Sequence, residues 1–403
     1  MRPAVRRLAH LGALAAALAL SACAVRPPPS AVAPVSMTLS PVGFAALPGW
    51  GADSLAPALA TFRTGCDELE SGSPGRKLGG AGEAAQLGGT AQDWFAACQA
   101  AAKVPAGNES AARVFFEANF QPYAVAANGS TDGLFTGYFE PEVAGARAPG
   151  GPYRTPLLAR PHDLITADLG AFASDLKGRE INGRIDGTHL VPYYARAAIE
   201  SGALARQRLG LLWLKSPIDA FILQIQGSGR VRLSDGRIVR VTYAAQNGRR
   251  YVPIGRVLAD QGAIPLDQVS LQSIRAWLEA HPEQAKRVMD ENPSYVFFRE
   301  LDGVPPNEGP PGALGAPLTP QRSIAVDRRF LPLAAPVWVA TTDPLTSRPF
   351  QRLMLAQDIG GDIRGPVRAD IFWGWGPEAE ARAGKMRARG SDFVLLPRPA
   401  SGP

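Results

Sequence analysis

The sequence has few of the side chains that most often bind metals. Its 403 residues include three cysteines and four histidines. None of the histidines, at positions 10, 162, 189 and 281, stands at metal-ligand spacing from a cysteine or another histidine. Zinc sites need several such ligands close together. We therefore expect no metal and no other cofactor, and a serine or cysteine nucleophile lacks a persuasive histidine partner.

Other absences exclude further classes of protein. We find no internal repeat, no glycine-rich nucleotide-binding spacing, and no later apolar run long enough to cross a bilayer. The net charge is +6, with no run of lysine or arginine. Loss of residues 1–22, which hold three arginines and no acid, would leave +3. We therefore expect no nucleic-acid partner.

The N-terminus resembles a bacterial lipoprotein signal peptide. Three arginines precede an apolar stretch over residues 11–20, and residues 20–23 read Leu-Ser-Ala-Cys. We expect cleavage after residue 22 and lipid on Cys23. The alternative is a plain secretory signal in which Cys23 is incidental. Ala24 after the cysteine, in place of aspartate, favours the periplasmic face of the outer membrane.

The segment that follows should be a spacer, and it leaves two cysteines in the mature chain. Residues 23–50 begin with a proline-rich stretch without a hydrophobic period, which is typical of a linker. Cys66 and Cys98 are a disulfide candidate in an oxidising compartment. Two buried free thiols are the alternative.

The remaining pattern predicts a chain that is mainly β with some helices. About 380 mature residues favour two domains. Residues 52–125 have apolar residues at helical spacing. Short β-branched and aromatic runs then alternate with turns, which favours barrels. We expect strands at 134–139, 220–226, 230–233, 238–243, 323–327, 336–340, 352–357, 369–373 and 392–396, a hairpin turn at 234–237, and helices at 191–206 and 267–289.

Residues 356–376 are the most informative stretch, because acids and bulky aromatics stand among closely spaced glycines. Aromatic faces beside carboxylates suit a sugar, which has apolar faces and polar edges. Asp370 lies inside an apolar run, where turn chemistry gives no reason for a charge, so it must be paired or neutral if buried. Burial raises a carboxyl pKa toward that of a general acid. Asp370 is therefore our candidate acid, whereas the residues around Asp327 and Asp362 favour ordinary turn aspartates that bind backbone amides.

A second polar cluster covers residues 224–230, Gln-Ile-Gln-Gly-Ser-Gly-Arg. On a strand, Gln224 and Gln226 would share one face. Amides, a hydroxyl and glycine-exposed backbone suit sugar hydroxyls and acetamido groups. A plain turn is the alternative for Gly227, Ser228 and Gly229.

These segments together resemble the membrane-bound lytic murein transglycosylase A family, from about residue 130 to 397. Asp327, Asp358 and Asp370 resemble the acids of its C-terminal three-aspartate domain. Many ordered matches are more specific than any one motif. The matching segments are Phe135–Pro141, Tyr153–Leu157, Gln224–Gly229, Tyr251–Gly255, Asn292–Phe298 and Pro317–Asp327.

The resemblance implies a fold and an activity. The fold is a double-psi β-barrel catalytic domain built from residues 51–142 and 290–400, with a second β-barrel inserted over 143–289 and a glycan groove where they meet. The activity is cleavage of the β-1,4 bond between N-acetylmuramic acid and N-acetylglucosamine in peptidoglycan, giving a 1,6-anhydro product. Implied partners are peptidoglycan glycan strands and, through the lipid, the membrane.

The resemblance also implies roles for individual residues. Asp370 is the lone catalytic acid, and Asp358 and Asp327 are supporting acids. Asp362 departs from the family pattern and leaves open which acid assists Asp370. The residues expected to bind substrate are Thr136, Gly137, Tyr138, Gln224, Gln226, Gly227, Ser228 and Trp373.

Three other functions stay open on the sequence. A hydrolase would use Asp370 and Asp358 as an acid and base pair. A wall-binding or wall-loosening module would need no catalysis, because fold does not determine function. A scaffold would bind wall-synthesis proteins.

Overall fold

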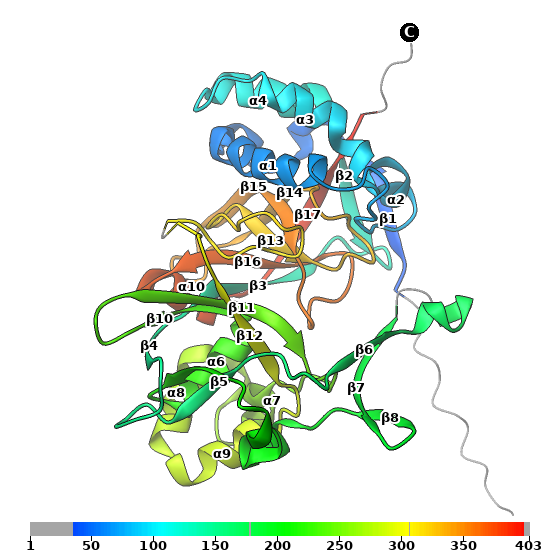
Figure 1. Ribbon diagram of the computed structural model, residues 1–403. Helices are drawn as coiled ribbons and strands as arrows, with labels where there is room; N and C mark the ends of the chain where they lie inside the picture. Colours follow the sequence, from blue (N-terminus) through cyan, green and yellow to red (C-terminus); the bar gives the residue numbers. More distant parts are fainter. Residues whose placement is uncertain (1–34, 177–178, 306, 399–403) are drawn as a thin grey trace, which may run out of the picture. The chain divides into compact units, whose positions relative to one another are not determined.

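The computed structural model describes residues 35–176, 179–305 and 307–398 (Figure 1). The expected signal peptide and Cys23 lie outside the described residues. Within the described part of the chain, no helix is both long and apolar enough to cross a membrane.

Strands from both ends of the described chain form one eight-stranded sheet. Six of its strands pair in a closed ring in the order β17-β14-β15-β13-β16-β3, because β17 also pairs with β3. β2 adds to β17, and β1 adds to β2. The strands are β1 Met37–Pro41, β2 Phe120–Ala127, β3 Gly133–Glu140, β13 Ser323–Val326, β14 Pro336–Thr342, β15 Pro349–Asp358, β16 Arg368–Trp375 and β17 Arg387–Pro397.

A second sheet, of six strands, is formed mainly by the middle of the chain, in the order β12-β11-β10-β4-β9-β5. A bridge between Ala159 and Phe298 brings its two edges together. The strands are β4 Glu142–Ala146, β5 Thr155–Leu158, β9 Gly210–Leu214, β10 Ser228–Arg232, β11 Ile238–Gln246 and β12 Val296–Leu301. A separate three-stranded sheet contains β6 Ile165–Asp168, β7 Glu180–Asp186 and β8 His189–Pro192.

Helices pack against the first sheet, and others lie between the strands of the middle part of the sequence. α1 packs against α3, α4 and β15 (Figure 1), and its Cys66 forms a disulfide with Cys98 of α3. The helices are α1 Leu55–Glu70, α2 Glu83–Gly88, α3 Phe95–Ala102, α4 Glu109–Asn119, α5 Arg196–Ala198, α6 Pro217–Gln226, α7 Ile254–Asp260, α8 Leu271–Ala280, α9 Pro282–Asp290 and α10 Pro377–Lys385. Short 3-10 turns occur at Phe44–Ala46, Trp50–Ala52, Ala91–Trp94, Leu169–Ala171, Ser174–Leu176, Ala205–Gln207 and Leu266–Gln268, and a π-turn at Ile199–Ala203.

The strand expected at 220–226 is wrong, because these residues belong to helix α6. The Ser216 hydroxyl caps the helix by accepting hydrogen bonds from the amides of Ile218 and Asp219. Pro217 starts the helix, and Gly227 ends it with φ of 78°, a conformation that glycine adopts readily. These local signals outweigh the β-branched content of the segment.

Other boundaries also differ from the expectation. β1 lies inside the segment expected as a linker, and it pairs with β2, which lies at the end of the segment expected to be helical. The expected helix at 267–289 is two helices that meet at His281, and 191–206 holds only short turns of helix. β12 lies beyond residue 289 and yet pairs with β11 of the middle sheet. The hairpin at 234–237 is confirmed by the pairing of β10 with β11.

The core of the first sheet contains one uncompensated acid. Asp392 of β17 is 1% exposed, and within the described residues neither carboxyl oxygen has a hydrogen-bond partner. Burial raises its pKa to about 8. An unfolded aspartate has a pKa near 3.9. The contribution of Asp392 to the free energy of unfolding is therefore greatest below pH 3.9, and it is lost as the pH rises through about 8.

We therefore expect Asp392→Val to stabilise the protein at pH 8 by about 1–3 kcal/mol, with a smaller gain at pH 5. Urea unfolding at the two pH values measures this. Asp392→Asn is the matched control, since it removes the titration and keeps a polar group. Equal gains for Asp392→Val at both pH values would contradict the assignment.

Candidate active site

The parallel pairing of β3 with β16 builds the site. It sets Thr136 beside Asp370 and Tyr138 beside Phe372, and paired residues point to the same face of the sheet. The Thr136 hydroxyl donates a hydrogen bond of 2.6 Å to Asp370 Oδ1, and the Tyr138 and Phe372 rings lie 5.2 Å apart. Every second residue of β3 therefore contributes to one polar and aromatic surface.

Asp370 is an acid whose charge is only partly compensated. Its side chain is half-buried, and burial raises its pKa. The Arg368 guanidinium and the Thr136 hydroxyl favour the carboxylate, whereas the charge of Asp362 opposes it, and the net pKa stays above the ordinary value. A carboxyl with a raised pKa is suited to donating a proton near neutral pH.

Asp358, at the end of β15, is the second acid of the site. Its Oδ2 accepts a hydrogen bond of 2.8 Å from the Tyr138 hydroxyl, and its Oδ1 accepts one of 3.0 Å from the Ala313 amide. Burial raises its pKa to about 6, and the charge of Asp370 contributes to the rise while the hydrogen bonds oppose it. The two carboxyls therefore influence each other's protonation.

The other two acids have different surroundings. Asp327 accepts hydrogen bonds from Arg329 and, at 2.8 Å, from the Gly365 amide. Burial raises its pKa, but these donors outweigh the burial and hold the pKa below its ordinary value. Asp327 thus stays charged and anchors the β15–β16 loop. Asp362 is exposed on that loop, and its charge contributes to the raised pKa values of Asp370 and Tyr251.

The residues expected from the 224–230 cluster divide into two groups. Gln226 reaches the first sheet, where its side-chain oxygen accepts a hydrogen bond of 3.0 Å from the Phe139 amide. Gly227 and Ser228 follow it at the start of β10. Gln224 instead lies on the buried side of α6, 6% exposed. Because α6 is a helix, Gln224 and Gln226 do not share a face as they would on a strand.

Trp373 does not lie on the face that carries Asp370, in contrast to the expectation that it binds substrate. It is 4% exposed, its ring centroid is 5.3 Å from that of Phe350, and its indole N–H points to Met386 Sδ at 3.3 Å. Strand alternation explains the difference, because residues three apart on a strand point to opposite faces. Gly137 packs against the same indole, where a Cβ would meet Trp373 Nε1 at 2.5 Å.

Sequence reasoning missed a buried ionic cluster beside these acids. Glu140 of β3 is 0% exposed, and its carboxylate accepts hydrogen bonds from Arg230 Nε at 2.8 Å and Arg240 Nη2 at 2.9 Å. Arg240 also donates to the Pro305 carbonyl. Glu140 follows Thr136 and Tyr138 at two-residue intervals, so period-two spacing along 136–140 is the signal that could have found it.

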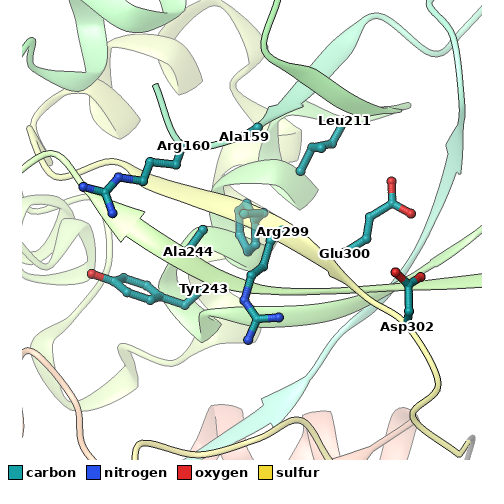
Figure 2. A pocket seen from close by; sticks show the side chains of 9 residues that line it. Ala159, Arg160, Leu211, Tyr243, Ala244, Arg299, Glu300 and Asp302 are labelled. Atoms are coloured by element: carbon teal, nitrogen blue, oxygen red, sulfur yellow. The ribbon is translucent and has the colours of Figure 1, made fainter. Parts of the chain in front are cut away.

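Two pockets of the described residues lie away from these acids. A pocket of about 690 Å³ on the middle sheet is lined by residues of β9, β11 and β12, among them Tyr243, Arg299 and Glu300 (Figure 2). A second, of about 410 Å³, adjoins it and shares Glu300. Neither is lined by Asp370 or Asp358, so side-chain geometry, and not cavity size, locates the site. No cluster of metal-ligating side chains occurs among the residues described.

Comparison with known proteins agrees with this architecture. The model of the MltA specific insert domain matches residues 134–299, and that of the 3D domain matches 322–396. Membrane-bound lytic murein transglycosylase A of Escherichia coli K12 is 32% identical over 275 residues, 66% of this chain and 67% of the relative.

Solved structures give the same result. A membrane-bound lytic murein transglycosylase from Agrobacterium tumefaciens has a TM-score of 0.79 at 34% identity, over 90% of this chain and 98% of that one. Escherichia coli MltA with bound chitohexaose has a TM-score of 0.65 at 26% identity, over 90% and 95%. The fold is thus that of a class of glycan-cleaving enzymes. The chain belongs to the membrane-bound lytic murein transglycosylase A family, with a C-terminal 3D domain.

The hydrogen bond from Tyr138 to Asp358 makes a testable prediction. Removing it with Tyr138→Phe should raise the pKa of Asp358 above about 6, because a bond to a charged group is worth about 1.5–3 kcal/mol. A carboxyl NMR titration measures this. Tyr243→Phe, at an exposed tyrosine of β11, is the control. An unchanged titration of Asp358 in Tyr138→Phe would refute the coupling.

Proposed function

We propose that the protein is a peptidoglycan lytic transglycosylase that cleaves the β-1,4 bond between N-acetylmuramic acid and N-acetylglucosamine. The observation that carries the proposal is a carboxyl with a raised pKa, Asp370, beside a second acid and on an aromatic face. Membership of the family supports the same reaction.

In this mechanism Asp370 begins protonated and donates its proton to the glycosidic oxygen as the bond from that oxygen to the muramic acid C1 breaks. The C6 hydroxyl of the same sugar attacks C1, so a new C6–O–C1 bond closes the 1,6-anhydro ring. The carboxylate of Asp370 takes the proton that this hydroxyl loses. One proton leaves and one returns, and no water is consumed.

The surrounding residues would assist in defined ways. The Thr136 hydroxyl orients the carboxyl of Asp370 through its hydrogen bond. Asp358, when charged, holds the proton on Asp370 by repulsion. Gln226, Gly227, Ser228 and Tyr138 would line the groove for the glycan, whereas Gly137 packs against Trp373 on the other face and Asp327 acts through the β15–β16 loop.

The finer points of location and architecture are also proposals. The closed six-stranded ring fits a double-psi barrel, with the middle sheet as the inserted barrel. Lipid on Cys23 would attach the protein to the periplasmic face of the outer membrane. Relatives named as membrane-bound support membrane association.

We expect Asp370→Asn to reduce release of anhydromuropeptides from purified sacculi by at least about a hundredfold, because general acid–base catalysis contributes about 10²–10⁴. The thermal midpoint should stay near wild type, since the amide keeps the shape and can still accept from Thr136. Mass spectrometry of the digest is the measurement. Retained turnover in Asp370→Asn would exclude Asp370 as the acid. Absence of turnover in the wild type would instead favour a non-catalytic wall-binding module or a scaffold.

The same digest tests the hydrolase alternative, in which Asp358 would activate water as a base. An anhydro product is one water lighter than a reducing end. A digest that contains only reducing ends would establish the hydrolase and refute the transglycosylase mechanism.

The pH profile tests the acid pair. Activity should fall as the pH rises and Asp370 loses its proton. In Asp358→Asn the like charge is gone, so the pKa of Asp370 falls and the alkaline limb should move to lower pH. The rate measured from pH 4 to 8 checks this. A limb that does not move, or moves to higher pH, would show that Asp358 does not support Asp370 in this way.

A further inference from the structure

Trp375 is turned onto the face of Asp370 by an irregularity in β16. Phe372 pairs with Tyr138, and the next pair is Trp375 with Glu140. Between these two pairs β16 advances by three residues and β3 by only two, so β16 contains one extra residue. This is a β-bulge, and Gly374 at its centre has φ of 96°. Bulges next to active sites often redirect a side chain. Without it, Trp375 would point to the same side as the buried Trp373.

A side-chain contact independently confirms the direction of Trp375. The Arg230 guanidinium carbon lies 4.1 Å from the centroid of the indole, while Arg230 Nε binds Glu140 at 2.8 Å. The indole and Glu140 therefore lie on the same side of the sheet, as do Tyr138 and Thr136. The ion pair with buried Glu140 holds Arg230, and Arg230 in turn holds the indole.

The indole is held but not covered. Trp375 remains partly exposed, whereas Phe372 and Trp373 are buried. A rigid aromatic face open to solvent beside hydrogen-bonding groups matches the apolar face and polar edge of a sugar ring, and it costs little side-chain entropy on binding.

We propose that Trp375 is a substrate-binding residue that packs against an N-acetylhexosamine ring of the glycan strand. The proposal rests on the glycan-cleaving function above. Glu140 lies four residues beyond Thr136, about 13 Å at the usual rise of about 3.3 Å per residue. Trp375 thus contacts a sugar other than those joined by the scissile bond. Its contribution is to binding and not to the proton transfer.

Binding of chitohexaose to the full-length protein tests this in the Asp370→Asn background, where the ligand stays intact. Calorimetry should give a dissociation constant roughly tenfold higher for the double variant, Asp370→Asn with Trp375→Ala, than for Asp370→Asn alone. This difference is in line with the energy of an aromatic contact. Trp375→Phe should recover most of the affinity. Trp277→Ala is the control, since Trp277 of α8 is also partly exposed but stacks on His281.

Turnover separates binding from catalysis. With Asp370 intact, Trp375→Ala should raise KM about tenfold and leave kcat nearly unchanged. If the Asp370→Asn protein binds chitohexaose equally well with and without Trp375→Ala, the role of Trp375 is refuted but the proposed function is not. No binding by the Asp370→Asn reference would refute glycan binding, and this inference with it. If Trp375→Ala does not fold, Trp375→Leu replaces it in the same measurement. Binding of chitohexaose by Trp375→Leu that is as tight as binding by Trp375→Phe would overturn the proposal.

Discussion

The parallel pairing of β3 with β16 is the constraint on which the site depends. It sets Thr136, Tyr138 and Glu140 in one row, opposite Asp370, Phe372 and Trp375. Side chains alternate along a strand, so a slip of one residue would turn a whole row to the other face. Register is held by a closed ring of strands, since β3 also pairs with β17 and β16 also pairs with β13.

Two kinds of acid stand on this one surface. The carboxylate of Glu140 is fully buried and meets two guanidinium groups, which is the arrangement that a buried charge requires. Asp370 and Asp358 have hydroxyl and amide donors but no ion pair among the described residues, so burial raises the pKa of each. The structure therefore compensates one acid with ion pairs and leaves its two neighbours with raised pKa values.

Sequence reasoning succeeded where local chemistry and tertiary context agree. The strands of the C-terminal part and the 234–237 hairpin follow from alternation and turn residues. The charge of Asp370 inside an apolar run predicted a partly buried carboxyl, and burial does raise its pKa. Sequence reasoning failed at α6, where apolar β-branched residues resembled a strand although Ser216, Pro217 and Gly227 are helix signals. It also failed at β2, whose partners β1 and β17 are far away in the sequence.

The sequence by itself determined the family and the mainly β character, because these depend on residue type and local period. It also selected Asp370 as the acid that we propose for catalysis. Only the tertiary structure decided what surrounds that acid. Thr136 lies beside Asp370 because β3 pairs with β16 across more than two hundred residues. Asp358 lies near because β13 pairs with both β15 and β16, and Ala325 of β13 has both acids as register partners. Which tryptophan faces Asp370 depends on a single extra residue at Gly374, because one bulge reverses the alternation that sequence reasoning assumes.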